Sequence, residues 1–569
     1  MLRAFDTHEI RECRDLEGLW SFDNGRRRTP VCVPGCWESV PGLERYRGRA
    51  VISREVETAA GHYRIDFKGV THTARVLWDG VEIARHYNGY TPFEAVAAGV
   101  SAGRHTLSVE VDNSFGEASA LHVPNDYMTY GGITRGVSLE RVPDVYIRWA
   151  HFTPERKGGG WTAEIALCLR NVADEDRAVR ATAECAGVRV DFGEIRVPAG
   201  ELSRVTARAD FPADVIPYEP DAPHMYPLRC RAASASGEDD LVERVGFREI
   251  RVEGRDILFN GKPLRLRGFN RHEDHPMFGC SLPLAAMEAD IQLMLDMGAN
   301  SVRTCHYPND ELFLDLCDEQ GILVWEEAHA RGLTEARMRN PNFLRQSLDC
   351  VDEMILNHYN HPSIYIWGIL NECASETEYG RNCYRALYDR IASLDSSRPM
   401  TSASCKQAAG WHDPDAADPA AGMDLTLGMP QVISHNMYPG WYVNVPDTAA
   451  YIRETFDGTR RAGGDKPIIL SETGAGAVYG YRSPKRDKWT EERQCEILEA
   501  CVEGAFALED LTALYLWQFC DCRVTEEEWF NGRPRTMNNK GLVDEYRRPK
   551  LAYETVKRLF TRRKEDARA

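Results

Sequence analysis

Two glutamates that each end an apolar stretch have the type and position needed for chemistry. Glu372 ends the run S-I-Y-I-W-G-I-L-N-E, and Glu472 ends the run K-P-I-I-L-S-E. If both runs are strands of one parallel barrel, both carboxyl groups project onto the same mouth. Two facing carboxyl groups could cleave a glycosidic bond, because one can protonate the leaving oxygen while the other acts on the anomeric carbon. Either glutamate alone could equally cap a helix or pair with an arginine.

Polar, acidic and aromatic residues follow other apolar stretches in the same way. A purely structural rim would more often carry Gly, Pro, Ser and Lys, so this concentration favours a site for a polar, ring-shaped ligand. The residues are Asn270, Arg271, His272, Glu273, Asp274, His306, Tyr307, Glu326, Glu327, Asn371, Asn436, Tyr438 and Trp517.

The elements that must position these residues follow a β/α rhythm after about residue 255. Helical patterns separate the strands, as at Leu284 to Met297, where apolar residues recur on one face. Eight β/α units in about 300 residues predict a TIM barrel, whose functional residues lie at the C-terminal ends of the strands. The predicted strands are 264–269, 300–304, 321–326, 363–369, 400–404, 431–436, 466–471 and 513–519.

The chain before the barrel has the pattern of β-sandwiches. Short alternating runs such as H-Y-R-I-D-F-K-G-V and H-T-L-S-V-E-V-D-N are separated by Gly, Asn and Asp turn signals. The first unit has the size of a jelly roll and the second that of an immunoglobulin-like sandwich. We therefore predict a multidomain chain with a jelly roll at 1–143, an immunoglobulin-like sandwich at 144–252 and the barrel at 253–569.

Composition restricts the class of protein. The chain has 569 residues, and its 69 basic and 87 acidic residues give a formal net charge of -18, which argues against a nucleic-acid partner. The start is charged and no stretch of about 18 apolar residues occurs, so we expect a cytoplasmic protein without a membrane partner. Seventeen cysteines without C-x-x-C pairs argue against a disulfide framework or a zinc ribbon. The C-D-C triplet at 520–522 is only a weak metal signal.

Four groups of motifs resemble the signatures of family 2 glycoside hydrolases, in the order and at the spacing of that family. The resemblance covers the whole chain, and it implies a sugar-binding jelly roll, an immunoglobulin-like sandwich and a catalytic barrel. The motifs are N-R-H-E at 270–273, R-T-C-H-Y-P at 303–308, N-H-P-S-I at 360–364 with W-G-I-L-N-E at 367–372, and K-P-I-I-L-S-E at 466–472.

The resemblance also implies roles for the residues. Glu372 would be the general acid/base and Glu472 the nucleophile of a retaining reaction, with a covalent intermediate and carboxyl groups about 5 to 5.5 Å apart. The two glutamates must then differ in protonation state at neutral pH. Tyr438 would hydrogen-bond the nucleophile, and Asn371 would bind the sugar 2-hydroxyl. His272, His306 and Trp517 are expected to contact the substrate as well.

The C-terminal part of the chain indicates which sugar is bound. The segment N-N-K-G at 538–541 resembles the Asn-x-Lys signature of β-glucuronidases, and N-M-Y-P-G-W-Y at 436–442 resembles another stretch of those enzymes. A uronic acid carries a carboxylate, which needs a fixed cation and an amide donor. Lys540 and Asn538 would supply them, with Tyr442 as a further donor. In an unrelated protein the same four residues would be an exposed turn.

Two further positions bear on the configuration of the sugar. In N-D-Y-M-T-Y-G-G-I at 125–133, which resembles a loop that reaches into the barrel, Asp126 would bind ring hydroxyls, at C4. Where metal-dependent galactosidases of the family carry a Glu-x-His magnesium pair, this chain reads H-A-R-G at 329–332. Arg331 argues against magnesium, and it could instead touch the C4 or carboxylate side of the sugar.

We therefore predict a retaining hydrolase that removes terminal β-D-hexuronic acid from small conjugates or oligosaccharides, with β-D-glucuronides favoured. A β-D-galacturonidase or a dual enzyme is the alternative, and a β-galactosidase or a non-catalytic carbohydrate-binding protein is less favoured. We expect no cofactor and no metal, and we expect the chain to form a homo-oligomer. The run His272 to His275 cannot surround one ion, because adjacent residues of an extended segment alternate faces. The run T-G-A-G-A-V-Y-G at 473–480 lacks the context of a dinucleotide loop.

Overall fold

The protein is described by a computed structural model that covers residues 2–406 and 423–566. Its C-terminal part is a closed barrel of eight parallel strands, which confirms the predicted TIM barrel. The strands are buried along their length because helices cover them outside and side chains fill the interior. They are β23 (Leu266–Arg271), β24 (Ser301–Thr304), β25 (Leu323–Glu327), β26 (Ile364–Ile369), β27 (Met400–Ser404), β28 (Ile433–Asn436), β29 (Ile468–Thr473) and β30 (Leu511–Leu516).

Helices connect these strands and form the outer layer of the barrel. Several begin at an N-cap whose side chain accepts a hydrogen bond from the first turn, as Asp310 does from the backbone N–H of Leu312. Gly321, with a φ of 70°, ends the same helix in the left-handed conformation. The helices are α1 (Leu284–Asp296), α2 (Glu311–Gln320), α3 (Glu335–Met338), α4 (Phe343–His358), α5 (Glu378–Leu394), α6 (Thr448–Gly463), α7 (Glu491–Phe506) and α8 (Leu551–Asp566).

The N-terminal part folds into an antiparallel sandwich, as predicted. A six-stranded sheet in the order β3-β2-β4-β10-β7-β8 faces a four-stranded sheet in the order β1-β12-β5-β9. Apolar residues from both sheets form one core. The strands are β1 (Glu12–Asp15), β2 (Gly18–Asp23), β3 (Arg28–Val33), β4 (Arg49–Thr58), β5 (Gly61–Phe67), β6 (Val70–Thr71), β7 (Thr73–Trp78), β8 (Val81–Tyr87), β9 (Phe93–Val100), β10 (Gly103–Asp112), β11 (Gly132–Ile133) and β12 (Val137–Val142).

A second antiparallel sandwich follows and has its own core. Its sheets have the orders β13-β14-β17 and β16-β15-β18-β19, and a small sheet, β20-β21-β22, leads into the barrel. The strands are β13 (Val145–Lys157), β14 (Gly160–Asn171), β15 (Arg177–Cys185), β16 (Val188–Val197), β17 (Leu202–Phe211), β18 (Tyr226–Ser234), β19 (Gly237–Val245), β20 (Ile250–Glu253), β21 (Asp256–Phe259) and β22 (Lys262–Pro263). The predicted domain limits, 1–143, 144–252 and 253–569, stay a prediction.

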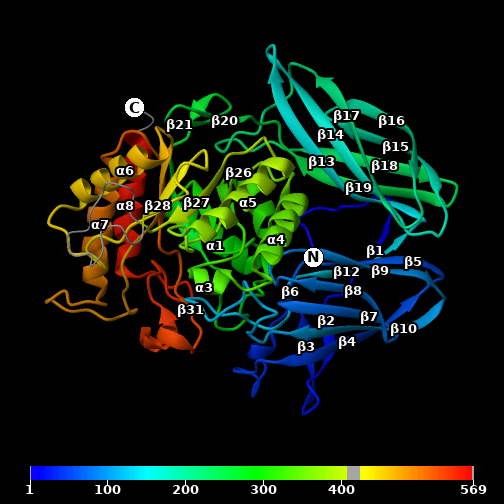
Figure 1. Cartoon of the computed structure of the whole chain (residues 1–569), viewed down its shortest axis with the longest axis horizontal. Helices are drawn as coiled ribbons and strands as arrows, with labels where there is room; N and C mark the ends of the chain where they lie inside the picture. The colour runs from blue at the N-terminus through cyan, green and yellow to red at the C-terminus, as the bar shows by residue number, and fades with distance from the viewer. Residues whose placement is uncertain (1, 407–422, 567–569) are drawn as a thin grey trace.

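The two sandwiches lie side by side along one flank of the barrel (Figure 1). Buried ion pairs join the parts: Nη2 of Arg135, in the first sandwich, donates to Oε2 of Glu273 at 2.8 Å. The backbone N–H of Asn125 donates to Oγ1 of Thr525 at 3.0 Å, so a loop of the first sandwich contacts the C-terminal segment of the barrel. This contact carries the neighbouring Asp126 to the barrel mouth.

Helix length and polarity bear on a membrane partner. In the stretches 2–406 and 423–566, no helix combines the length and apolar character needed to cross a bilayer.

Candidate active site

The two glutamates singled out by the sequence line one cavity of about 300 Å³ at the barrel mouth. Glu472 lies in β29, and Glu372 lies three residues beyond the end of β26. Leu370 and Glu372 have φ angles of 32° and 52°, which are costly for residues with a side chain. This backbone turn brings Glu372 to the same cavity as Glu472.

Glu472 is buried and accepts two hydrogen bonds. Nη1 of Arg303 donates to its Oε1 at 2.9 Å, and the hydroxyl of Tyr438 donates to its Oε2 at 2.7 Å. Burial raises the pKa of Glu472 to about 7, while the Arg303 cation and the Tyr438 hydroxyl act in the opposite direction. Burial and the carboxylates nearby also hold the pKa of Tyr438 well above its usual value, so its hydroxyl stays a donor.

Arg303, for which the sequence predicted no role, contacts several site residues. It is fully buried and donates from Nε to Oε2 of Glu327 at 2.8 Å. It also donates to Oδ1 of Asn270 at 2.9 Å and to Oδ1 of Asn371 at 2.8 Å. Burial raises the pKa of Glu327 to about 7. The arginine therefore fixes the positions of Glu472 and Asn371 together.

Glu372 has a more open setting. Nδ2 of Asn436 donates to its Oε1 at 3.0 Å, and Nη2 of Arg331 lies 3.6 Å from its Oε2. Asn371, next to it, accepts from Arg303 and from Asn436 through Oδ1. Among the residues that the structure describes, none accepts a hydrogen bond from the buried Nδ2 of Asn371. This amide group is therefore available to a ligand.

Cations gather at another part of the cavity. Nζ of Lys540, which is 2% exposed, donates to the hydroxyl of Tyr442 at 2.9 Å. Burial lowers the pKa of Lys540. Arg533 also lines the cavity and makes a bidentate ion pair with Asp126, in which Nε donates to Oδ1 at 3.0 Å. Such a cluster suits an anionic group on a ligand.

The amide of Asn538 has a protein partner. Its Nδ2 donates to Oδ2 of Asp126 at 3.1 Å, and the side chain is fully buried. Arg533 and Asn538 thus hold the Asp126 carboxylate from two sides. The sequence suggested that Asn538 donates to a sugar carboxylate and that Asp126 binds ring hydroxyls, and both roles stay predictions.

Trp517 lines the cavity, and two buried histidine rings pack against it. Trp517 stacks on the ring of His306, with centroids 5.1 Å apart and an angle of 16° between the planes. It meets His272 edge-on at 5.5 Å. Burial lowers the pKa of His272 to about 3 and holds that of His306 well below its usual value, so both rings are neutral. A neutral, aromatic surface suits the face of a pyranose ring.

The structure brings most of the predicted site residues to this cavity. Those that line it directly are Asp126, Arg331, Glu372, Tyr438, Tyr442, Glu472, Trp517 and Lys540. Four others are buried in the surrounding layer, namely His272, His306, Asn371 and Asn538. A larger cavity, of about 1120 Å³, lies between the six-stranded sheet and α4, and its lining includes no residue from a barrel strand end.

Sequence reasoning missed two of the residues that shape the site. Arg533 lies in N-G-R-P-R-T, a loop with no motif that distinguishes it from other surface arginines. Arg303 lies in the motif R-T-C-H-Y-P, so its position could have been noted from the resemblance. The partners of these arginines could not be identified from the sequence, because Arg533 and Asp126, for example, are 407 residues apart.

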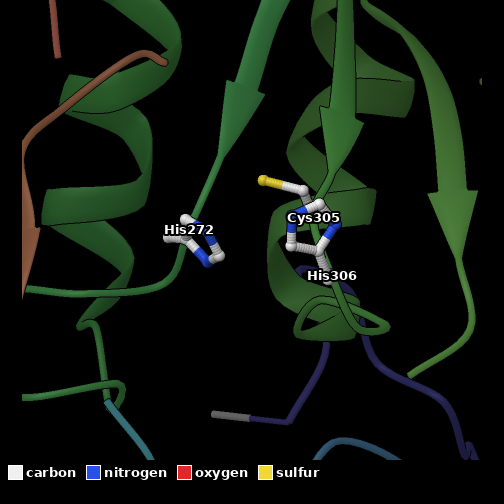
Figure 2. A group of neighbouring side chains, drawn as sticks. All are labelled: His272, Cys305 and His306. Atoms are coloured by element: carbon white, nitrogen blue, oxygen red, sulfur yellow. The ribbon is translucent and has the colours of Figure 1, made fainter. Parts of the chain in front are cut away.

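Possible metal ligands are grouped differently from the run at 272–275. The structure places His272 beside Cys305 and His306, with one ligand atom of each within 4.8 Å of the others (Figure 2). At the place that magnesium-binding relatives would use, Arg331 carries a positive charge. Glu372 holds the pKa of this guanidinium above its usual value, against the effect of burial. That position does not suit a cation.

Comparison with known proteins agrees with this geometry. Residues 250–564 match the family model described as glycosyl hydrolases family 2, TIM barrel domain. The chain belongs to glycosyl hydrolase family 2. It is therefore a glycoside hydrolase, and the resemblance found in the sequence motifs is confirmed.

Several relatives of this family 2 hydrolase span its whole length. The crystal structure of a GH2 β-galacturonidase from Eisenbergiella tayi bound to galacturonate is 49% identical, with a TM-score of 0.92, over 99% of this chain and 99% of that one. The β-glucuronidase of Streptococcus agalactiae is 27% identical over 97% of this chain and 96% of its own. The human β-glucuronidase is 27% identical over 95% of this chain and 90% of its own.

Proposed function

We propose that this family 2 hydrolase removes terminal β-D-hexuronic acid residues by double displacement, with β-D-galacturonides as its preferred substrates. The observation that carries the proposal is the combination, in one cavity, of two carboxyl groups and a separate cation cluster. Glu372 and Glu472 supply the first, and Lys540 and Arg533 the second. A pyranose carboxylate held by the cations would leave its anomeric carbon free to face the two glutamates.

In the first step, Glu472 attacks the anomeric carbon while Glu372 gives its proton to the leaving oxygen. The attacking carboxylate is held by Arg303 and Tyr438, which limits its freedom to rotate. The Asn371 amide, which has a free donor among the described residues, would bind the 2-hydroxyl, a contact that strengthens in the transition state.

In the second step, Glu372 takes a proton from water, and the hydroxide attacks the glycosyl-enzyme. The carboxyl group that was the acid is now the base, and Glu472 leaves as a carboxylate. Nη2 of Arg331 lies 3.6 Å from Oε2 of Glu372, so the guanidinium faces this carboxyl group during both steps.

The preference for galacturonides rests on two lines of support. The relative at 49% identity is described as a β-galacturonidase, and it covers 99% of this chain. Arg331 lines the cavity close to Asp126, whose carboxylate raises the pKa of the guanidinium. A cation there could donate to the axial C4 hydroxyl of galacturonate. This proposal reverses the order of preference that the sequence suggested.

A β-glucuronidase is the second candidate, because the more distant full-length relatives bear that name. A side-by-side assay of 4-nitrophenyl β-D-galacturonide and β-D-glucuronide tests both candidates. We expect the higher kcat/KM on the galacturonide. Turnover of neither uronide by the purified protein would refute the hexuronidase proposal.

The identity of the nucleophile is tested separately. A 2-fluoro uronide with a good leaving group should form a stable ester, and peptide mass spectrometry should place it on Glu472. A label on another residue would overturn the assignment. The cytoplasmic location and the homo-oligomeric state stay predictions, and light scattering on the purified protein tests the second.

A further inference from the structure

Three potential metal ligands of the barrel come from two neighbouring strands. His272 follows β23, while Cys305 and His306 follow β24, and these strands pair in parallel with Arg271 opposite Thr304. Figure 2 shows the thiol and the two imidazole rings at the ends of these strands. One ligand atom from each lies within 4.8 Å of the other two, and all three side chains are buried.

Each imidazole has one nitrogen engaged and one without a partner. Nδ1 of His306 is hydrogen-bonded to Oε1 of Glu327 at 2.8 Å, and Nδ1 of His272 to the hydroxyl of Tyr307 at 3.2 Å. Over residues 2–406 and 423–566, Nε2 of each ring has no hydrogen-bond partner. A carboxylate on the far nitrogen is a common support for a metal-binding histidine, because it orients the ring and makes the near nitrogen more basic.

We propose that His272, Cys305 and His306 bind one thiophilic divalent cation, such as Zn²⁺, and that this cation inhibits the enzyme from a position next to the nucleophile Glu472 at the base of the sugar site. The inhibition rests on the proposed hexuronidase function, but binding of the cation does not. Two imidazoles and one thiolate form a ligand set that binds Zn²⁺ in preference to Mg²⁺ or Ca²⁺, which favour oxygen ligands. The neutral rings each give a lone pair, and the thiol loses its proton to solvent as the sulfur–metal bond forms.

The cluster must contract slightly to bind. Ligand atoms around a tetrahedral Zn²⁺ lie about 3.3 to 3.7 Å apart, given metal–nitrogen and metal–sulfur distances of about 2.0 and 2.3 Å. The observed separations, within 4.8 Å, require shifts of about 1 Å, which side-chain rotation can supply. Oε1 of Glu472, which accepts from Nη1 of Arg303, lies 3.8 Å from Nε2 of His306, so a cation bound to Nε2 lies directly beside the nucleophile. A cation held there would exclude the anomeric carbon.

A second group, Asp315, Asp318 and His361, is a poorer candidate for the same ion. Asp315 already pairs with Arg3 at 2.8 Å, and Asp318 is hydrogen-bonded to His361 at 2.6 Å. A cation would have to displace the arginine. This group also lacks a thiol, so a sulfur signal distinguishes the two.

The test is a titration of the chelator-treated full chain with Co²⁺ as a coloured substitute for Zn²⁺. We expect one equivalent to bind and to give a near-ultraviolet band from thiolate-to-cobalt charge transfer. The band should disappear in Cys305→Ser and persist in the matched control Cys405→Ser, since Cys405 is another thiol at the cavity. His272→Gln should weaken Co²⁺ binding at least tenfold, which keeps the test valid if Cys305→Ser fails to fold.

Inhibition is measured separately with Zn²⁺ and a 4-nitrophenyl β-uronide. We expect competitive inhibition that is at least tenfold weaker in Cys305→Ser than in the parent chain. Absence of the band, or a band that follows Cys405, would overturn the proposed site. Because the cobalt titration needs no substrate, its result is independent of whether the enzyme hydrolyses uronides.

Discussion

Nη1 of Arg303 donates to Oε1 of Glu472 at 2.9 Å, and both side chains are almost completely buried. The pair places a positive charge directly beside the proposed nucleophile. Burial nevertheless dominates, and it raises the pKa of Glu472 to about 7. The protonation of this carboxyl group therefore changes within the range where the enzyme can be assayed.

The first prediction concerns the pH dependence of turnover. Only the ionised form of Glu472 can attack, so kcat/KM should fall about tenfold per unit as the pH drops below about 7. Tyr438→Phe removes a donor that favours the ionised form, so the acidic limb should move to higher pH by about one unit, together with a loss of rate. The measurement is kcat/KM against pH on a 4-nitrophenyl β-uronide. An exposed tyrosine outside the cavity, changed in Tyr481→Phe, is the control, and its profile should match the parent.

The second prediction concerns the sugar carboxylate. Lys540→Ala should lower kcat/KM on uronides by about 30-fold or more, because a buried charge partner is lost. Any trace activity on the matching neutral glycoside should change much less. Lys488→Ala is the matched control: Nζ of this exposed lysine lies 4.6 Å from the ring centre of Trp441, as Nζ of Lys540 does at 5.9 Å, but Lys488 does not line the cavity. Equal losses on both substrates would contradict a carboxylate contact.

The third prediction separates the two glutamates. Glu372→Ala should lower kcat/KM about 10²- to 10⁴-fold on uronides with a poor leaving group. The loss should be much smaller on activated uronides, because protonation of their leaving oxygen matters less. Azide, which needs no general base, should restore turnover and give a β-linked uronyl azide. Glu472→Gln should be inactive on both kinds of substrate. A Glu372→Ala enzyme that loses equally on all leaving groups would argue against the acid role.

The parts of the fold and site that the sequence predicts are those carried by local patterns. Buried strands such as β26 and β29 appear as unbroken apolar runs, and the residue types at their ends stand out from ordinary loops. Glu372 and Glu472 could be found for this reason. Their sharing of one cavity then follows from the barrel, in which all strand ends point to the same mouth.

The remaining features depend on contacts between distant segments. Asp126 reaches the cavity on a loop of the first sandwich, and Arg533 meets it from a C-terminal loop, so no spacing in the sequence relates them. The grouping of His272 with Cys305 depends in turn on the pairing of β23 with β24. A search along adjacent residues, such as the run 272–275, cannot detect a cluster built across two strands.

The fourth prediction asks how Arg533 acts. If it mainly holds Asp126 in place, Arg533→Ala and Asp126→Ala should each lower kcat/KM substantially, and the double variant should be no worse than Asp126→Ala alone. Truncating one partner of such a buried pair typically costs about 2 to 5 kcal/mol, because the other charge is left unpaired. Additive losses in the four-enzyme cycle would instead indicate that Arg533 contacts the sugar independently of Asp126.

The fifth prediction concerns the C4 configuration. Arg331 lines the cavity, with Nη2 3.6 Å from Glu372 and Nη1 3.3 Å from Oδ1 of Asn125, the neighbour of Asp126. Its removal in Arg331→Ala should lower kcat/KM on the galacturonide at least tenfold more than on the glucuronide, because an axial C4 hydroxyl loses its donor. General damage to Glu372 would lower both rates alike, so the ratio isolates the contact with C4. Arg337→Ala, which removes a surface arginine that pairs with Glu528, should leave the ratio unchanged. If Arg331→Ala leaves it unchanged as well, the preference must arise elsewhere in the cavity, and Asp126 with its Arg533 partner is the next place to test.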